Sequence, residues 1–200
     1  MQLVFNWIIN NYIEISGSIL SLIYLYFSIK QKIALWFFGL VSSALYIVVY
    51  FNAKFYADMG LQFYYVFVSI YGWFYWKKGK NIADTKKIKR TDLKTATILF
   101  LITLVIFIII GWFLDTQTDS QIPYWDSFTT SASITATWML ARKHIEHWLI
   151  WIVVDSVSLC LYIYKDLYPT SVLFVIYTVM AFVGYFAWKK IYISEKSEQH

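Results

Sequence analysis

The sequence predicts an all-α integral membrane protein with seven transmembrane helices, its N-terminus outside the cell and its C-terminus in the cytoplasm. Three observations support this fold class: an apolar composition, seven long apolar stretches, and basic residues that gather in alternate loops. The chain is 60% hydrophobic and 22% aromatic, with a mean hydropathy of +0.55. Such a chain has too little polar surface to coat a soluble globule. We therefore expect residues 1–200 to form a single transmembrane domain.

Each apolar stretch is long enough to cross a bilayer as a helix. A hydrocarbon core about 30 Å thick needs roughly 20 apolar residues, because the backbone polar groups must pair within the segment. The seven stretches are Tyr12 to Ile29, Ile33 to Phe51, Tyr56 to Trp76, Thr95 to Leu114, Ser127 to Ala141, Ile145 to Tyr164 and Thr170 to Trp188.

The fifth stretch is the least apolar, because seven of its residues are serine or threonine. Small hydroxyl residues suit helix packing or a water-lined cavity better than lipid contact. Asp126 follows Pro123 and precedes this stretch, so we expect it to be the N-cap. The single cysteine, Cys160, lies in the sixth stretch, which excludes an intrachain disulfide and predicts a buried side chain.

The basic residues alternate between the loops and set the orientation. They follow the first, third, fifth and seventh stretches, and only Lys54 and Lys165 fall on the other side. Since short cytoplasmic loops carry the excess of Lys and Arg, these four loops should be cytoplasmic. The longest of them, Lys77 to Lys94, is expected to be a solvated loop that touches anionic membrane lipid, and nucleic-acid binding is not expected.

A gapless internal repeat appears when the chain is shifted by 112 positions. The shift places Trp36 on Trp148. It also places Gly72, Phe74, Trp76, Lys77 and Lys78, in that order, on Gly184, Phe186, Trp188, Lys189 and Lys190. This predicts repeat units over residues 12–78 and 124–190, joined by a connector helix over 95–114. Because one extra crossing separates them, the units are parallel in this 3+1+3 plan, as in SWEET sugar transporters. In that class the substrate site lies near the midplane between the units.

The sixth stretch carries the first group of candidate substrate-binding residues. Trp148, Trp151 and Asp155 are spaced i, i+3, i+7 and share one helical face. A carboxylate near mid-membrane costs about 2.5 to 3.5 kcal/mol to insert, so Asp155 should face the bundle or a cavity. Two indoles and a carboxylate suit a flat cation, through stacking, cation–π contact and charge neutralisation. The alternative role for Asp155 is a structural hydrogen bond to a neighbouring helix.

A second candidate group lies on the third stretch, where Gln62, Tyr65 and Ser69 share a stripe, with Tyr177 as the repeat counterpart of Tyr65. Gln62 offers an amide that could pair with a carboxamide or hydroxyl, or else pack against the adjacent helix. The tryptophans beside the basic clusters, Trp73, Trp76 and Trp188, are expected to anchor the helices at the membrane interface.

The motifs of several other functions are missing. The sequence has no Walker A pattern, no HExxH and no Cys/His cluster with metal spacing. No nucleophile, base and orienting group stand out, so we predict no enzyme, no catalytic residues, no metal and no cofactor. A sensor or scaffold with seven helices is the alternative from a different class, but it would not require paired units or a midplane carboxylate.

The chain resembles the PnuC family of bacterial vitamin transporters along its whole length. The segments that carry the resemblance are LQFYYVFVSIYGWFYW (61–76), PYWDS (123–127), ARKHIEHWLIWIVVD (141–155) and GYFAW (184–188). The resemblance points to Trp148, Trp151, Asp155 and Gln62. It departs at His147, where many nicotinamide riboside members have Asn, and at Asp155, where some have Asn.

The resemblance implies facilitated uptake of nicotinamide riboside across the bacterial inner membrane. A cytoplasmic vitamin kinase would then be a functional partner, since phosphorylation traps the vitamin inside the cell. Relatives that carry thiamine, another flat cation, leave thiamine open as the substrate. The sequence also leaves open proton coupling through Asp155, the access state, and whether the chain assembles as a homo-oligomer.

Overall fold

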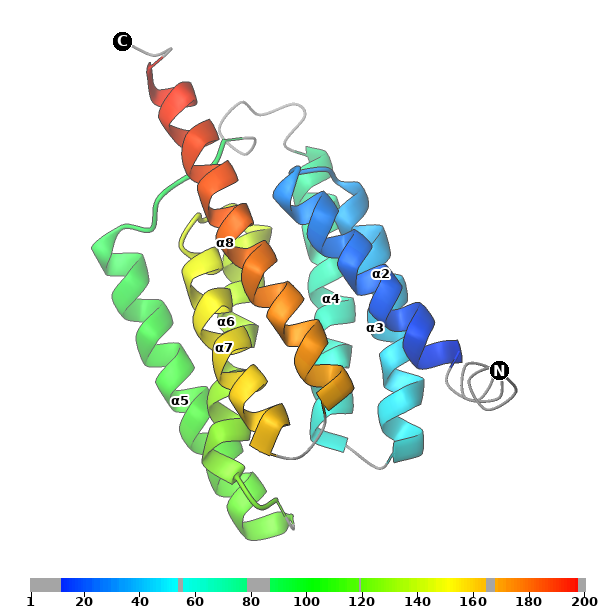
Figure 1. The fold of residues 1–200 in the computed structure, drawn as a ribbon. Helices are drawn as coiled ribbons and strands as arrows, with labels where there is room; N and C mark the ends of the chain where they lie inside the picture. The colour runs from blue at the N-terminus through cyan, green and yellow to red at the C-terminus, as the bar shows by residue number, and fades with distance from the viewer. Residues whose placement is uncertain (1–11, 54–55, 79–86, 119, 165–167, 198–200) are drawn as a thin grey trace. The chain divides into compact units, whose positions relative to one another are not determined.

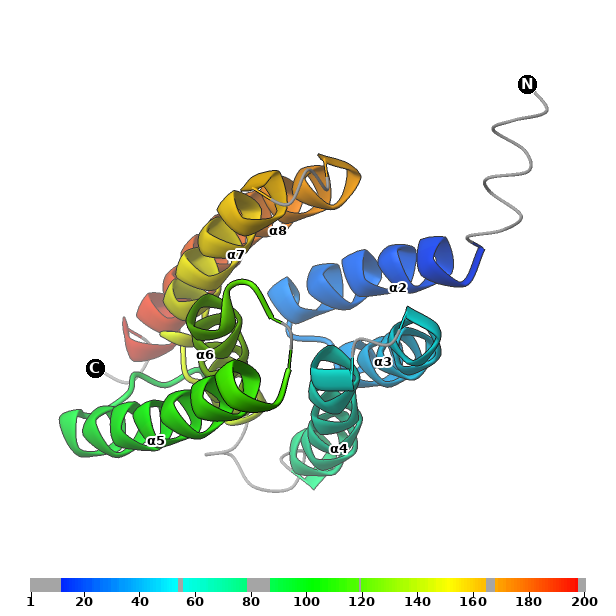
Figure 2. The same cartoon turned by 90° about the horizontal axis from the view of Figure 1, so that it is seen from below.

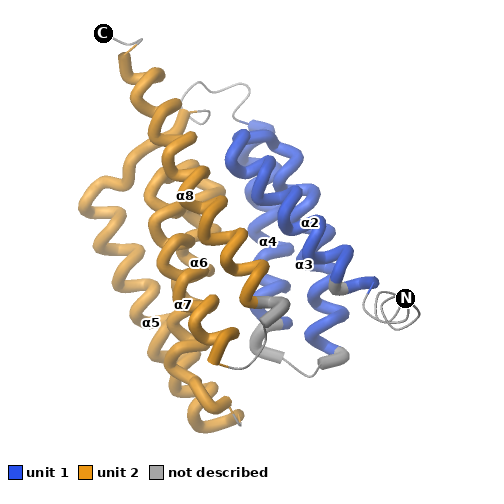
Figure 3. The backbone as a smooth tube through the Cα atoms, viewed as in Figure 1, with its two compact units in different colours: residues 1–86 blue, residues 87–200 orange. Residues whose placement is uncertain are grey.

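The computed structural model describes residues 12–53, 56–78, 87–118, 120–164 and 168–197. Within these residues the chain forms seven α-helices, α2 to α8. The contacts divide the chain into two compact units, residues 1–86 and 87–200 (Figure 3). Each unit is described by itself below.

The seven helices follow the seven apolar stretches closely (Figure 1). Every predicted segment contains one helix, and most boundaries differ by a few residues, as expected where helix ends fray. The helices are α2 (Tyr12–Ile29), α3 (Ala34–Ala53), α4 (Tyr56–Lys78), α5 (Leu93–Gln117), α6 (Pro123–Ala141), α7 (His147–Tyr164) and α8 (Tyr168–Ser197).

The first unit is a three-helix bundle in which α2 packs on α3 and α3 packs on α4 (Figure 2). Small residues bring α2 and α3 close together, since Gly17 lies directly against the Tyr46 ring. The Ser42 hydroxyl donates to the Gly17 carbonyl at 3.0 Å, and Ser18 shares a 2.8 Å hydrogen bond with the Tyr46 hydroxyl. Close backbones joined by hydroxyl hydrogen bonds are typical of helix pairs in membranes.

The second unit contains α5 to α8, and each helix packs on the next one along the chain. The hydroxyl-rich helix α6 lies between α5 and α7 in this order, and ten of its residues are buried. Its hydroxyls serve the packing: Ser127 donates to the Phe107 carbonyl at 2.5 Å, and Thr135 shares a 2.5 Å hydrogen bond with Thr103. We expected these hydroxyls to serve either helix packing or a water-lined cavity. In both contacts with α5 they serve helix packing.

One prediction about a helix end is wrong. Helix α6 begins at Pro123, so Asp126 lies in its first turn rather than at the N-cap, and its carboxylate accepts from the Ser120 hydroxyl at 3.1 Å. Proline favours the first helical position, because its missing N–H has no partner there in any case. Helix α8 continues past Trp188 to Ser197, beyond the ends of α6 and α7 (Figure 1).

Four helices in the described residues are long and apolar enough to cross a membrane: Ala34–Phe51, Leu93–Gln117, His147–Tyr164 and Ser171–Ser197. Among the described residues, the apolar segment found in α2 is the shorter Ile15–Ile29. Lysines dilute the end of α4, and serines and threonines dilute α6. Large apolar side chains lie exposed along α5, as expected of a helix in contact with lipid. Cys160 is also exposed, so the prediction of a buried cysteine is wrong.

Candidate functional site

Asp155 is a buried carboxylate in the middle of α7. Only 5% of its surface is exposed, and we find no hydrogen bond or ion pair to it among the described residues. The predicted alternative, a structural hydrogen bond to a neighbouring helix, is therefore not observed there. A carboxylate without a partner inside a membrane-spanning helix is costly. Such a cost is typical of a group kept for a ligand rather than for stability.

The residues around Asp155 on α7 form a face of mixed chemistry. Trp151 precedes Asp155 by one turn and is half-buried, so part of its indole is accessible. Ser158 follows by three residues and is buried, which places a hydroxyl on the same face. The sequence analysis missed Ser158, although the i, i+4, i+7 spacing of Trp151, Asp155 and Ser158 would have indicated it.

Trp148 belongs to the core of the second unit rather than to an open face. Its side chain is 1% exposed and meets Trp188 edge to face, with ring centroids 5.9 Å apart. The ring lies against Gly184: a Cβ atom at that glycine would come within 2.6 Å of it. Gly184 is therefore required for the close approach of α7 and α8.

The first unit contains the same three residues in the same arrangement. Trp36 lies against Gly72 and meets Trp76 edge to face, with ring centroids 5.5 Å apart. Each of these residues precedes its partner in the second unit by 112 positions, so the sequence repeat and the packing coincide. Trp76 is 8% exposed and Trp188 is fully buried, so the prediction that these two anchor the helices at the membrane interface is wrong.

His147 completes the aromatic cluster of the second unit. It is fully buried, with its ring centroid 4.5 Å from that of Trp148 and 4.8 Å from that of Trp188. Its Nδ1–H donates to the His144 carbonyl at 2.6 Å, which leaves Nε2 as the acceptor in a neutral ring. Nε2 has no partner among the described residues. The neighbours of His147 indicate packing at the start of α7.

The candidates on α4 and α8 lie in more varied surroundings. Gln62 and Tyr65 are half-buried on α4, and the Tyr64 and Tyr65 rings are tilted with centroids 6.0 Å apart. Ser69 is buried, close to Gly39 of α3. Tyr177 is half-buried on α8 and meets Phe174 edge to face at 5.5 Å. The structure thus brings Gln62, Tyr65 and Ser69 onto one unit, and Trp148, Trp151, Asp155 and Tyr177 onto the other.

Hydrogen bonds of Thr91 with Glu146 and His144, which the sequence did not predict, join the start of α5 to the loop between α6 and α7. We call this group of residues the polar clasp. Glu146 accepts from the Thr91 backbone N–H at 2.9 Å and from the Thr91 hydroxyl at 2.8 Å. The Thr91 oxygen shares a 3.0 Å hydrogen bond with His144 Nδ1. The Lys89 N–H donates to the Lys143 carbonyl at 3.1 Å, and the Ile145 N–H donates to the Lys89 carbonyl at 3.0 Å.

Electrostatics support this clasp. Burial lowers the pKa of His144, and the neighbouring Lys89 lowers it further, so the ring is neutral. Asp92 caps α5, and the hydrogen bond from Thr95 lowers the pKa of its carboxyl. The Arg90 to Glu146 ion pair, at 3.4 Å, lies at the surface and contributes little. Thr91 and Glu146 therefore tie the start of α5 to the loop between α6 and α7.

The described residues offer no site for a metal ion, since no three His, Cys, Asp or Glu side chains gather there. A cavity of about 220 Å³ lies between α3 and α4 and is almost entirely apolar. It has the Ser69 side chain but no charge, so it suits a hydrocarbon better than a charged substrate.

Comparison with known proteins identifies the family. A family model described as "Nicotinamide mononucleotide transporter" matches residues 11–190. The chain belongs to this family. Membership and the four apolar helices confirm the prediction of a multi-pass membrane protein. The family is one of membrane transporters, in agreement with the expectation of a protein that is not an enzyme.

Individual members of the nicotinamide mononucleotide transporter family resemble the chain over most of its length. The nicotinamide riboside transporter PnuC of Escherichia coli K12 is 27% identical over 204 residues, covering 89% of this chain and 85% of that protein. PnuC of Neisseria mucosa is also 27% identical, over 173 residues covering 81% and 66%. The crystal structure of the vitamin B3 transporter PnuC matches with a TM-score of 0.77 at 24% identity, covering 96% of this chain and 87% of that one. That match supports the all-helical fold.

Proposed function

We propose that this protein carries out facilitated uptake of nicotinamide riboside across the bacterial inner membrane. The observation that carries the substrate class is Asp155, buried in a membrane-spanning helix without a partner among the described residues. Nicotinamide riboside is a flat pyridinium cation with ribose hydroxyls, and a carboxylate both neutralises such a charge and accepts from hydroxyls. The family match and the relatives named nicotinamide riboside transporter support this vitamin.

Each candidate residue has its own role in binding the substrate at the proposed site. Asp155 faces the positive charge, and the half-buried Trp151 offers an indole for stacking or cation–π contact. Gln62, Tyr65, Ser69 and Tyr177 are proposed to supply hydrogen bonds and ring contacts, and a contribution from both repeats stays a prediction. Trp148, buried in the core of the second unit, is proposed to hold α7 in the position that leaves Trp151 accessible to the substrate.

The transport cycle rests on the repeat architecture. The proposed units are parallel, as in SWEET transporters, with the N-terminus outside and the C-terminus in the cytoplasm. The shared packing of Trp36, Gly72 and Trp76 and of Trp148, Gly184 and Trp188 supports a duplication. Rocking of one unit against the other would give alternating access. Trapping by a cytoplasmic kinase that phosphorylates the vitamin would make the uptake directional.

Thiamine is the second candidate substrate, because its thiazolium ring is also a flat cation and Asp155 would serve either vitamin. The thermal stability of purified protein with nicotinamide riboside, thiamine or riboflavin separates the two. We expect stabilisation by nicotinamide riboside alone. Stabilisation by thiamine instead would change the substrate, and stabilisation by none would contradict the transporter proposal.

The role of the charge has a sharper test. The reduced, dihydropyridine form of nicotinamide riboside has nearly the same shape but no positive charge. Wild-type protein should prefer the oxidised cation, and Asp155→Asn should lose that preference. A hydrogen bond to a charged group contributes about 1.5 to 3 kcal/mol, so we expect a loss of about tenfold to a hundredfold in affinity. Asp115→Asn, at the exposed end of α5, is the matched control and should retain the preference.

A further inference from the structure

A groove on the first unit shares one residue, Ser69, with the proposed transport site, and its other lining residues have no direct contact with the substrate in that proposal. The cavity of about 220 Å³ lies between α3 and α4. Ser69 is its principal polar side chain. The other lining residues are Trp36, Phe37, Leu40, Ile70, Trp73 and Phe74.

The groove is open at its side, because three of its lining residues are exposed. Phe37, Ile70 and Phe74 are 55%, 43% and 57% exposed. Exposed Phe and Ile side chains on membrane helices face the hydrocarbon of the bilayer. An apolar cavity of about 150 Å³ already stays free of water and takes up a benzene molecule. The groove is therefore large enough to hold part of a hydrocarbon chain.

Positive charge stands at one end of the groove. Lys77 lies three and four residues after Phe74 and Trp73, on the same face of α4 and about one turn farther along it. Lys77 and Lys78 are both exposed. Helix α3 begins one residue after Ile33, so exposed Lys32 stands at the same end of the pair, beside the first turn that carries Phe37. An apolar channel that ends at lysines complements a lipid tail with an anionic head.

We propose that this groove binds an anionic glycerophospholipid of the surrounding bilayer. One acyl chain lies between α3 and α4 against Leu40, Ile70 and Trp73, and the phosphate contacts Lys77 and Lys78. Each lysine near a membrane surface adds about 1 kcal/mol of attraction to anionic lipid, so the two lysines together favour anionic over zwitterionic lipid by tenfold or more.

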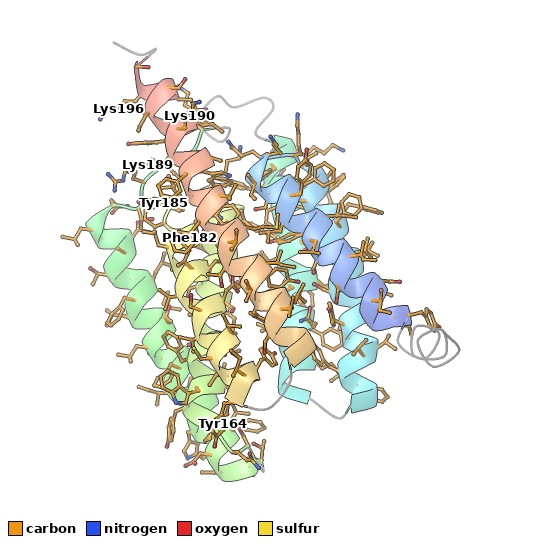
Figure 4. The ribbon with its side chains drawn as sticks, in the orientation of Figure 1. Tyr164, Phe182, Tyr185, Lys189, Lys190 and Lys196 are labelled. Atoms are coloured by element: carbon orange, nitrogen blue, oxygen red, sulfur yellow. The ribbon has the colours of Figure 1, made fainter. Side chains whose placement is uncertain are left out.

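The second unit provides a matched control. The repeat counterparts of Ile70, Trp73 and Phe74 are Phe182, Tyr185 and Phe186 on α8. Lys189 and Lys190 follow them, and Figure 4 labels both lysines together with Phe182 and Tyr185. The Lys189 ammonium lies over the Tyr185 ring, 5.8 Å from its centroid, so this charge already has an aromatic contact. Removing Lys189 and Lys190 changes the net charge by the same amount as removing Lys77 and Lys78, at a different place.

Photo-crosslinking tests the proposal on the purified full-length protein. The probes are phosphatidylglycerol and phosphatidylcholine that carry the same diazirine-labelled acyl chain, and the labelled peptides are mapped by mass spectrometry. We expect phosphatidylglycerol to label residues 36–40 and 69–74, with unlabelled phosphatidylglycerol competing about tenfold better than phosphatidylcholine. Ile70→Trp should abolish this labelling by filling the groove. Lys77→Gln/Lys78→Gln should reduce it about tenfold, and Lys189→Gln/Lys190→Gln should leave it unchanged.

Three results would overturn the proposal. Equal labelling by the two lipids would remove the role of the lysines. Labelling spread evenly over the exposed faces of α5 and α8 would show an ordinary lipid annulus. An Ile70→Trp variant that folds and changes its oligomeric mass, but not its lipid labelling, would identify the groove as a contact between protomers.

Discussion

Gly184→Ala should destabilise the protein although alanine is the better helix former. The new Cβ atom would lie 2.6 Å from the Trp148 ring, which is only 1% exposed and has no room to move away. Overpacking of this kind costs about 1 to 3 kcal/mol, whereas glycine to alanine in a helix returns about 0.5 to 1 kcal/mol. Because a contact of 2.6 Å is severe, we expect a cost in the upper part of the overpacking range, about 2 to 3 kcal/mol. The net loss is then about 1 to 2.5 kcal/mol, which lowers the midpoint by roughly 2 to 10 °C in a chain of this size.

Two further variants make this prediction specific. Gly72→Ala, the repeat counterpart, should lower the midpoint similarly, because its Cβ atom would meet the Trp36 ring. Gly60→Ala is the control: a Cβ atom there meets nothing within 4 Å, so the midpoint should stay the same or rise by a few degrees.

The assay is thermal unfolding in one detergent, followed by circular dichroism at a single scan rate, because membrane proteins commonly unfold irreversibly. The variants are then ranked by apparent midpoint. If Gly184→Ala and Gly60→Ala have the same midpoint, the close contact between α7 and α8 does not exist as described, and the packing shared by the two units loses its support.

Three other predictions concern the polar clasp and the two tryptophans of α7. Glu146→Gln should weaken the hold on Thr91 and speed amide hydrogen exchange at the start of α5, while exchange in α8 stays unchanged. Because the pKa of His144 is lowered in the folded protein, its contribution to stability is complete above the ordinary value of about 6.5 and is lost as the pH falls below it. The thermal midpoint should therefore drop more between pH 7.5 and 5.5 in wild-type protein than in His144→Gln, and equal drops would contradict this. Trp148→Ala should lower stability by about 3 kcal/mol or more, whereas Trp151→Ala should lower vitamin affinity with a smaller loss of stability; the reverse pattern would exchange their roles.

The helices were predictable because the bilayer imposes their length. Each apolar stretch had to satisfy its backbone within one segment, so hydrophobicity alone located α2 to α7 within about four residues at each end. The predicted start of α6 lies four residues too late, because Asp126 is interpreted as the N-cap. Pro123 is itself a signal for the first helical position.

The packing of the tryptophans was harder to predict. Trp76 and Trp188 stand beside lysines, and from the sequence that position is typical of interface anchors. Their burial depends on Gly72 and Gly184, one turn earlier, which let another tryptophan approach the helix backbone. The glycine and tryptophan spaced i, i+4 in both repeats were the signal for this contact.

The clasp could not have been predicted from one sequence. It joins Thr91 to Glu146 across 55 residues, and no periodic pattern relates the two positions. The buried state of Asp155, by contrast, followed from its depth in an apolar helix, since a carboxylate there must avoid lipid.

Counterflow in proteoliposomes tests the proposed function most directly. Vesicles containing the purified protein are loaded with unlabelled nicotinamide riboside and diluted into a trace of labelled vitamin, with no kinase and no pH gradient. Facilitated diffusion predicts rapid accumulation of label, strongly reduced by Asp155→Asn. No accumulation above protein-free vesicles, or accumulation only when a pH gradient is imposed, would contradict it.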